Sequence, residues 1–172
     1  MFSDPAANIA KLGLAEGMKV ADLGAGSGFY AIEAAKKVGA SGRVYAVDVQ
    51  KDLLERLRSA AQAAGLHNVE VVWGNAEKIG GTKLREGAAD RAIVSNVLFQ
   101  VAAPDDFALE AKRILKPGGK ALVVDWSEAS PLGPKTVFPS MKAQALFEKS
   151  GFALEQSFKA GDHHYGLVFT RT

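Results

Sequence analysis

Short apolar runs alternate with amphipathic segments along the whole chain. Each run is mostly apolar, as is typical of strands that are covered on both faces of a sheet. The pattern predicts such strands at Val20–Leu23, Val44–Val47, Val69–Trp73, Ala89–Val94 and Lys120–Val124. Two further strands are expected near the C-terminus, at Phe152–Lys159 and Tyr165–Thr170.

Helical spacing of apolar residues marks the segments between these runs. It predicts helices at Phe29–Val38, Lys51–Ala64, Pro104–Leu115 and Phe138–Ser150, and a short helix near Asn8–Leu12. Two of these segments are followed by Gly65 and Gly151, at the position where glycine commonly ends a helix. Lys116-Pro117-Gly118-Gly119 predicts a turn, and Glu77–Gly87, which holds three glycines, predicts a loop.

Alternation of strands and helices is typical of right-handed β-α-β crossovers, which build a parallel sheet covered on both faces. Only the short segment around Ala160-Gly161-Asp162 separates the last two strands, which is too short for a crossover and predicts an antiparallel hairpin. The expected fold is therefore α/β, a doubly wound, seven-stranded, mostly parallel sheet with a C-terminal antiparallel hairpin strand. No linker interrupts the pattern, so residues 1–172 are expected to form a single domain.

Composition narrows the function classes. The 21 Lys and Arg residues against 19 Asp and Glu residues give a net charge of +2, which argues against nucleic acid as a partner. The absence of cysteine excludes disulfides, thiolate metal sites and a cysteine nucleophile. The N-terminus lacks the pattern of a signal peptide, and no apolar run has the length of a membrane span. These features favour a cytoplasmic protein.

Three alternate glycines follow the first strand, at Gly24, Gly26 and Gly28. Glycine allows a tight turn and lets a ligand approach the backbone closely. The spacing differs from the dinucleotide fingerprint G-x-G-x-x-G, and the Lys-Ser or Lys-Thr of a phosphate-binding P-loop is missing. A purely structural turn and an NAD-binding domain remain alternatives at this point.

Two acidic residues flank this glycine loop. Asp22 lies inside the first strand, where a carboxylate is costly unless a cationic ligand or a loop N–H group is its partner. Asp48 ends the second strand, twenty residues after Gly28, in the place where an acid can bind both hydroxyls of a ribose. The alternative for Asp48 is an ordinary surface acid at a strand end.

Together these motifs resemble the class I S-adenosylmethionine-dependent methyltransferases. The resemblance rests on Asp22-x-Gly24-x-Gly26-x-Gly28, on Asp48, and on Asn75-Ala76 after the third strand. Arg113–Val124 is similar to that family's turn into its fifth strand, and the terminal hairpin is similar to its reversed seventh strand. The resemblance covers nearly the whole chain and is nearest to the small-molecule enzymes that resemble the ubiquinone and menaquinone biosynthesis methyltransferases.

The resemblance implies S-adenosylmethionine as cofactor and assigns residues to each of its parts. On the methionine side, the loop backbone would pass close by at Gly24, Gly26 and Gly28, and Asp22 would hold the amino group directly or through water. Ser95 and Asn96, after the fourth strand, would contact the methionine part and face the methyl group. On the nucleoside side, the binding residues would be Asp48 for the ribose, and Val49, Asn75 and Ala76 for the adenine. Asn75 and Asn96 also suit an alternative role as loop-turn residues.

The implied reaction is methyl transfer, which depends mainly on positioning and desolvation because a sulfonium donor is already activated. A general base is needed only where the acceptor loses a proton. Asp125 directly follows the fifth strand, and His163 and His164 begin the returning strand, so a pair of Asp125 with His163 or His164 is a candidate base. The alternative is solvent-facing histidines and a turn aspartate. No metal site is expected, because adjacent residues on a strand point to opposite faces.

The acceptor is expected to be a small molecule. Ser95–Phe99 lacks the Asn/Asp-Pro-Pro-aromatic box of enzymes that methylate exocyclic base amines and glutamine amides, and the absence of cysteine argues against arsenic methylation. An RNA or protein methyltransferase and a non-catalytic S-adenosylmethionine-binding subunit remain alternatives, and a homo-oligomer could complete the pocket. Tyr30 and Phe99 suit either a pocket wall or the core, and Trp73 is expected in the core.

Overall fold

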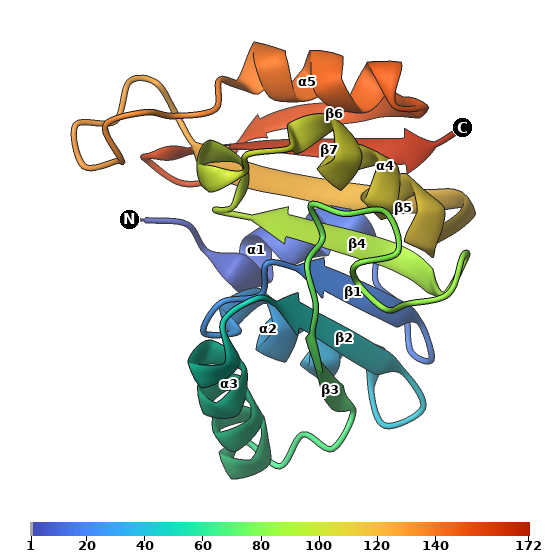
Figure 1. Cartoon of the computed structure of the whole chain (residues 1–172). Coiled ribbons are helices and arrows are strands. Elements are labelled where there is room, and N and C mark those ends of the chain that lie inside the picture. Colours follow the sequence, from blue (N-terminus) through green and yellow to red (C-terminus); the bar gives the residue numbers. More distant parts are fainter. Residues whose placement is uncertain (1) are drawn as a thin grey trace.

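A seven-stranded sheet forms the centre of the computed structural model, which describes residues 2–172 (Figure 1). The strands are β1 (Lys19–Leu23), β2 (Arg43–Asp48), β3 (Val69–Trp73), β4 (Ala89–Ser95), β5 (Leu115–Trp126), β6 (Phe152–Lys159) and β7 (His164–Arg171). The α-helices are α1 (Pro5–Ile9), α2 (Phe29–Val38), α3 (Lys51–Ala63), α4 (Pro104–Ile114) and α5 (Ser140–Lys149). Two short 3-10 helices are η1 (Ala10–Leu12) and η2 (Leu98–Gln100).

The strand order is β3-β2-β1-β4-β5-β7-β6. Strands β1 to β5 are parallel, and β7 is antiparallel to both β5 and β6, which confirms the predicted fold class and hairpin. The turn expected at Lys116–Gly119 is instead part of β5, where the register with β4 shifts between Ala89 and Arg91. Pro139 precedes α5, so this helix begins at Ser140, two residues later than predicted.

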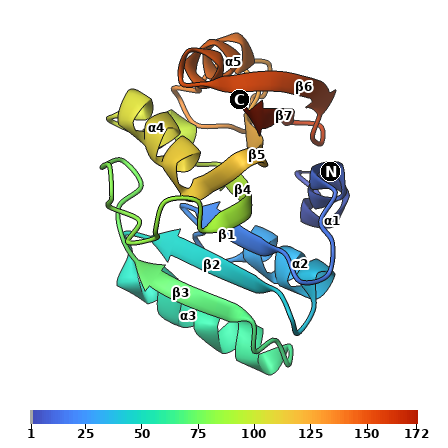
Figure 2. The same ribbon diagram turned by 90° about the vertical axis from the view of Figure 1, so that its right-hand side faces the viewer.

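Helices cover both faces of the sheet (Figure 2). One buried cluster joins α1, α2 and α3 to the sheet, and the other joins α4 and α5 to its opposite face. Side chains alternate between the two faces along β1, so that Val20 packs in the first cluster while Ala21 and Leu23 pack in the second. No helix within residues 2–172 combines the length and apolar character needed to cross a bilayer.

Trp73 is not part of the core, contrary to the prediction. It ends β3, the outermost strand on one side of the sheet, and is 53% exposed. Its indole Nε1 donates to the Val49 carbonyl oxygen at 3.0 Å, and Lys51 Nζ lies 3.9 Å from its ring centre. An edge strand has one side without a neighbouring strand, which is why its apolar residues are less covered than those of β1 or β4.

Gly28 ends the glycine loop in a conformation that only glycine adopts without strain, with φ at 91°. A Cβ atom at this position would lie 2.4 Å from Cγ of Leu57, which is fully buried on α3. Gly28→Ala is expected to lower the free energy of unfolding by about 2–3 kcal/mol, through left-handed strain and overpacking. Urea denaturation would measure this loss.

Gly26→Ala is the matched control for this prediction. Gly26 also has a positive φ, at 56°, but nothing lies within 4 Å of a Cβ placed there. The free energy of unfolding of Gly26→Ala should therefore fall by only about 1 kcal/mol, the cost of left-handed strain. Equal losses in the two variants would contradict the proposed contact of Gly28 with Leu57.

Candidate functional site

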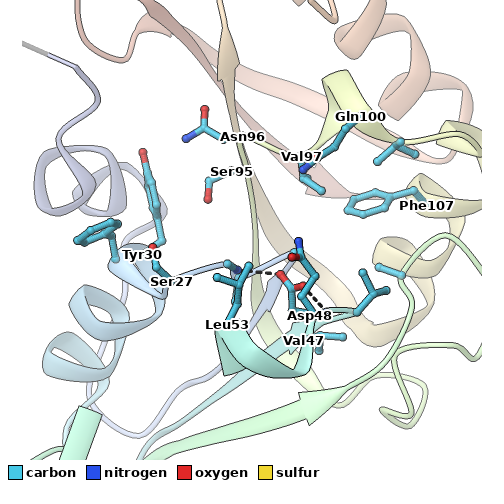
Figure 3. A pocket seen from close by; sticks show the side chains of 18 of the residues that line it. Ser27, Tyr30, Val47, Asp48, Leu53, Ser95, Asn96, Val97, Gln100 and Phe107 are labelled. Atoms are coloured by element: carbon cyan, nitrogen blue, oxygen red, sulfur yellow. Dashed lines mark hydrogen bonds between the residues drawn. The ribbon is translucent and has the colours of Figure 1, made fainter. Parts of the chain in front are cut away.

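A cavity of about 680 Å³ lies at the edge of the sheet where the parallel strands end (Figure 3). Its volume is in the range of pockets that hold small organic ligands. The wall is formed by the glycine loop after β1, the ends of β2 and β4, the segment after β3, and residues near the N-terminus. In Figure 3, Ser95 and Asn96 lie on the far side of the cavity from Asp48, with Tyr30 and Val97 on opposite flanks.

The glycine loop is fixed against the end of β2 by backbone hydrogen bonds. Gly24 and Ala25 N–H groups both donate to the Val47 carbonyl, at 2.8 and 3.0 Å. Gly24 has a φ of 77°, and a Cβ there would lie 2.8 Å from Val97 Cγ2. The loop backbone therefore passes closely between β2 and Val97 and is exposed to the cavity without a side chain in the way.

Asp48 contributes a carboxylate to the cavity wall at the end of β2. Its Oδ2 accepts from Gly26 N–H and its Oδ1 accepts from Gln50 N–H, both at 2.9 Å. Each carboxylate oxygen has two lone pairs, so the group retains acceptor capacity for ligand hydroxyls. The two backbone bonds hold the carboxylate in one orientation.

Asp22 lies in β1 and is completely buried, outside the cavity wall. Neither carboxylate oxygen has a hydrogen-bond partner within residues 2–172, so the loop N–H partner considered from the sequence is not present. Burial, and to a lesser extent the negative charge of Asp48, raises the pKa of Asp22 to about 7, against a smaller lowering effect of the Ala31 N–H group. A nearby cationic group would stabilise the ionised form.

Most of the predicted cofactor residues are brought together here. The cavity wall includes Gly24, Gly26, Asp48, Val49, Asn75, Ala76, Ser95 and Asn96. Asp22 and Gly28 are outside the wall. Asp22 is buried on the same face of β1 as Val20, which α2 covers, and Gly28 packs against Leu57. Asn75 also shows the turn role, since its Oδ1 accepts from Glu77 N–H at 2.9 Å.

Within residues 2–172, Asp125 forms no hydrogen bond with either of the histidines expected as its partner, His163 or His164. The buried carboxylate of Asp125 instead accepts from the Leu98 and Trp126 N–H groups, at 2.9 and 2.8 Å. Burial raises the pKa of Asp125 to about 6. His163 Nδ1 lies 3.1 Å from Ser130 Oγ. The Asp125 carboxylate thus connects η2 to the end of β5. Of the two neighbouring histidines, His164 lines the cavity.

Several wall residues were not identified from the sequence. Phe2, Ser3 and Pro5 reach the cavity because the N-terminal segment is tied to Tyr30, whose hydroxyl bonds to Ser3 Oγ and to Asn8 Nδ2. Tyr30 serves both expected roles, since it is 5% exposed within the core and also lines the cavity. Trp126, which was not identified, and His164, which was named from the sequence as a candidate base, complete the wall at the β5 and β7 ends. Phe99 packs against the core instead.

Comparison with known proteins links this architecture to one family. A family model described as a methyltransferase domain matches residues 14–164. A solved S-adenosylmethionine-dependent methyltransferase from Aquifex aeolicus is 28% identical, with a TM-score of 0.88, and the alignment covers 99% of this chain and 90% of that one.

The matches to curated relatives cover a smaller part of those proteins than the match to the Aquifex aeolicus structure does. The ubiquinone/menaquinone biosynthesis C-methyltransferase UbiE of Bordetella avium is 35% identical over 127 residues, which is 73% of this chain and 48% of that protein. An arsenite methyltransferase of Aquipseudomonas alcaligenes is 38% identical over 117 residues, 65% of this chain and 34% of that protein. The chain therefore spans about a third to a half of the length of these relatives.

Proposed function

The chain belongs to the S-adenosylmethionine-dependent methyltransferase family, and we propose that it transfers a methyl group from this cofactor to a small organic acceptor. The observation that carries the proposal is the cavity beside the glycine loop, with the oriented Asp48 carboxylate on its wall and the unpartnered Asp22 buried beneath it. Bound S-adenosylmethionine supplies a methyl group that its sulfonium charge has already activated.

The residues present fit this cofactor. Asp48 has free acceptor capacity for the ribose hydroxyls, and Val49, which is 55% exposed at the rim, offers an apolar surface for the adenine. Ala76 lies on the same wall beside Asn75. Asp22 has no cationic partner in the described chain, and the ammonium group of the methionine part would supply one. Gly24 and Gly26 have no side chains, so the methionine part can approach their backbone closely.

Protein residues act on the reaction by binding, orienting and excluding water. Ser95 and Asn96 extend from the end of β4 into the cavity, between the nucleoside side and the β5 end, in the place assigned to the methionine part. The apolar wall residues Val97, Val101 and Phe107 keep water away from that region. Desolvation of this kind favours a displacement in which a positive charge is lost.

We propose an organic acceptor because the chain has no thiolate that could hold trivalent arsenic. The near-neutral charge gives no support to RNA as acceptor. Protein substrates and a non-catalytic cofactor-binding role are the remaining alternatives. We propose that residues 1–172 form one domain and that the protein is cytoplasmic. A homo-oligomer that completes the pocket is a further option.

Calorimetric titration tests the cofactor assignment directly. We expect binding of S-adenosylmethionine and S-adenosylhomocysteine, and no binding of NAD. Binding of NAD alone would contradict the proposed function. A screen of metabolites for release of S-adenosylhomocysteine then separates an enzyme from a non-catalytic binding subunit and identifies the acceptor.

Asp48→Ala is expected to weaken the binding of S-adenosylmethionine by about 1–3 kcal/mol, as for the loss of a hydrogen bond to a charged group. The reason is that the variant loses the acceptor for the ribose hydroxyls and also the bond that orients Gly26. Asp52→Ala is the matched control, because Asp52 is an exposed acid in the first turn of α3. Calorimetry that gave the same affinity for both variants would remove Asp48 from the site.

A further inference from the structure

The β5 and β7 end of the cavity has an aromatic wall. Trp126 and His164 are register partners across β5 and β7, and their rings lie 4.3 Å apart at 36°. The Phe2 ring meets Trp126 edge-on, with ring centres 6.3 Å apart at 81°. All three side chains line the cavity, and we call them the aromatic slot. Such edge and offset arrangements are the ones aromatic rings prefer.

The aromatic slot is distant from the proposed nucleoside side. Strands β1 and β4 lie between β2, which carries Asp48, and β5, which carries Trp126. Three strand spacings amount to about 14 Å. The slot therefore belongs to the part of the cavity that the ribose and adenine contacts leave free.

His164 has polar atoms that nothing in the described chain satisfies. The residue is 4% exposed, and neither Nδ1 nor Nε2 has a hydrogen-bond partner within residues 2–172. Unpaired polar atoms at buried positions are uncommon and costly, so each one needs an explanation. Burial, and to a lesser extent the neighbouring His163, lowers the pKa of His164. The ring is therefore neutral at neutral pH and presents one donor and one acceptor.

A second unpaired polar atom lies on the same cavity wall. Asn96 Oδ1 is buried and has no partner within residues 2–172. Asn96 directly follows β4 and has a left-handed backbone conformation, with φ at 53°, so the chain leaves the strand direction at this residue. The cavity thus combines aromatic surfaces with hydrogen-bonding groups that lack partners.

We propose that the acceptor is a planar aromatic compound with a hydroxyl group, whose ring packs in the aromatic slot and whose hydroxyl bonds to the His164 imidazole. This inference rests on the methyltransferase function proposed above. A phenolic hydroxyl fits because it can donate to the free ring nitrogen of His164. The same nitrogen can take the hydroxyl proton, in which case the O–H electron pair stays on oxygen and leaves a phenolate.

The test uses 4-methylphenol as the probe and 1,4-dimethylbenzene as its isostere without a hydroxyl. The chain has three histidines, so ¹⁵N labelling of histidine gives three sets of ring signals. Binding is measured by nuclear magnetic resonance with S-adenosylhomocysteine at saturation. We expect 4-methylphenol to shift the ring nitrogen signals of His164, and those of His67 to stay in place.

Variants separate hydrogen bonding from packing. His164→Gln should weaken the binding of 4-methylphenol about tenfold and that of 1,4-dimethylbenzene less than twofold, because only the hydroxyl loses a partner. The affinity for S-adenosylhomocysteine should stay within twofold. His163→Gln, the neighbouring substitution, should leave 4-methylphenol binding within twofold, since His163 does not line the cavity and contacts the slot from behind Phe2, with ring centres 5.5 Å apart.

Two failures can be distinguished. If S-adenosylhomocysteine does not bind, the proposed function itself is wrong. If it binds but 4-methylphenol leaves His164 unshifted, or His164→Gln weakens both probes equally, the proposed acceptor class is wrong and the methyltransferase function stands. A loss confined to His163→Gln would also overturn the role given to His164.

Discussion

Glu110→Ala is expected to lower the free energy of unfolding by about 3 kcal/mol. Glu110 is fully buried on α4, and its carboxylate accepts from Gly80 N–H at 2.8 Å and from the Thr82 hydroxyl at 2.6 Å. Arg113 Nε and Nη2 donate to it at 2.8 and 2.7 Å. Alanine would leave the Gly80 N–H, the Thr82 hydroxyl and Arg113 Nε without this acceptor, while Arg113 Nη2 keeps its hydrogen bond to the Leu84 carbonyl at 2.8 Å. Breaking a buried ion pair commonly costs about 3–5 kcal/mol. We expect the lower value because the Arg113 side chain is 24% exposed.

The control for this prediction is Asp106→Ala, an exposed acid on the same helix, which should change stability by no more than about 0.5 kcal/mol. Urea denaturation at pH 7 measures both variants. The hydrogen bonds of Glu110 lower its pKa against the effect of burial. Its stabilising effect is therefore complete above the unfolded-state pKa and is lost as the pH falls. Similar losses for the two variants would show that the Glu110 network does not hold the fold.

The hydrogen bonds of Glu110 also hold a loop that forms part of the cavity wall. It binds Gly80 and Thr82, and the Gly81 carbonyl between them accepts from Asn75 N–H at 2.8 Å. Asn75 and Ala76 line the cavity. The loop that borders the proposed adenine side is therefore anchored from α4, and Glu110→Ala should also weaken cofactor binding.

The sheet could be predicted from the sequence because buried parallel strands leave short, continuous apolar runs. This reasoning found β1, β2 and β4 to within one residue at each end, but it placed the start of β5 five residues too late, because it read Lys116–Gly119 as a turn. It failed at Trp73, because an apolar run does not reveal which strand lies at the edge of the sheet. The order of the strands, which decides this, comes from contacts between distant parts of the chain.

That the glycine loop, Asp48 and Asn75 line one cavity could also be predicted, since each lies at or just after the end of a parallel strand. The aromatic slot could not, because Phe2 and His164 meet Trp126 only through the N-terminal segment and the register of β5 with β7. The expected pair of Asp125 and His163 failed for the same reason. In that register Trp126 is opposite His164, while Asp125 is opposite Tyr165.

Asp22 should make the protein less stable as the pH rises. Its folded-state pKa of about 7 is above the unfolded value of about 3.9, so between these values the folded chain holds a proton that the unfolded chain has lost. The free energy of unfolding is therefore expected to fall by about 4 kcal/mol from pH 4 to above pH 7 through this group. Asp22→Asn removes this contribution. Asp125 titrates in both proteins, so its effect cancels in the difference between their stability profiles.

The same carboxyl should make cofactor binding depend on pH. A cationic amino group near Asp22 favours the ionised form, so binding at pH 5.5 must release the proton that Asp22 holds there. We expect the affinity for S-adenosylhomocysteine to rise roughly tenfold from pH 5.5 to 7.5, a change that one shifted pKa can supply. Calorimetry in buffers of different ionisation enthalpy would detect the released proton, and Asp22→Asn should bind without releasing it. An unchanged affinity across this range in the native chain, or the same rise in Asp22→Asn, would show that the ligand's amino group does not stabilise the ionised carboxylate of Asp22.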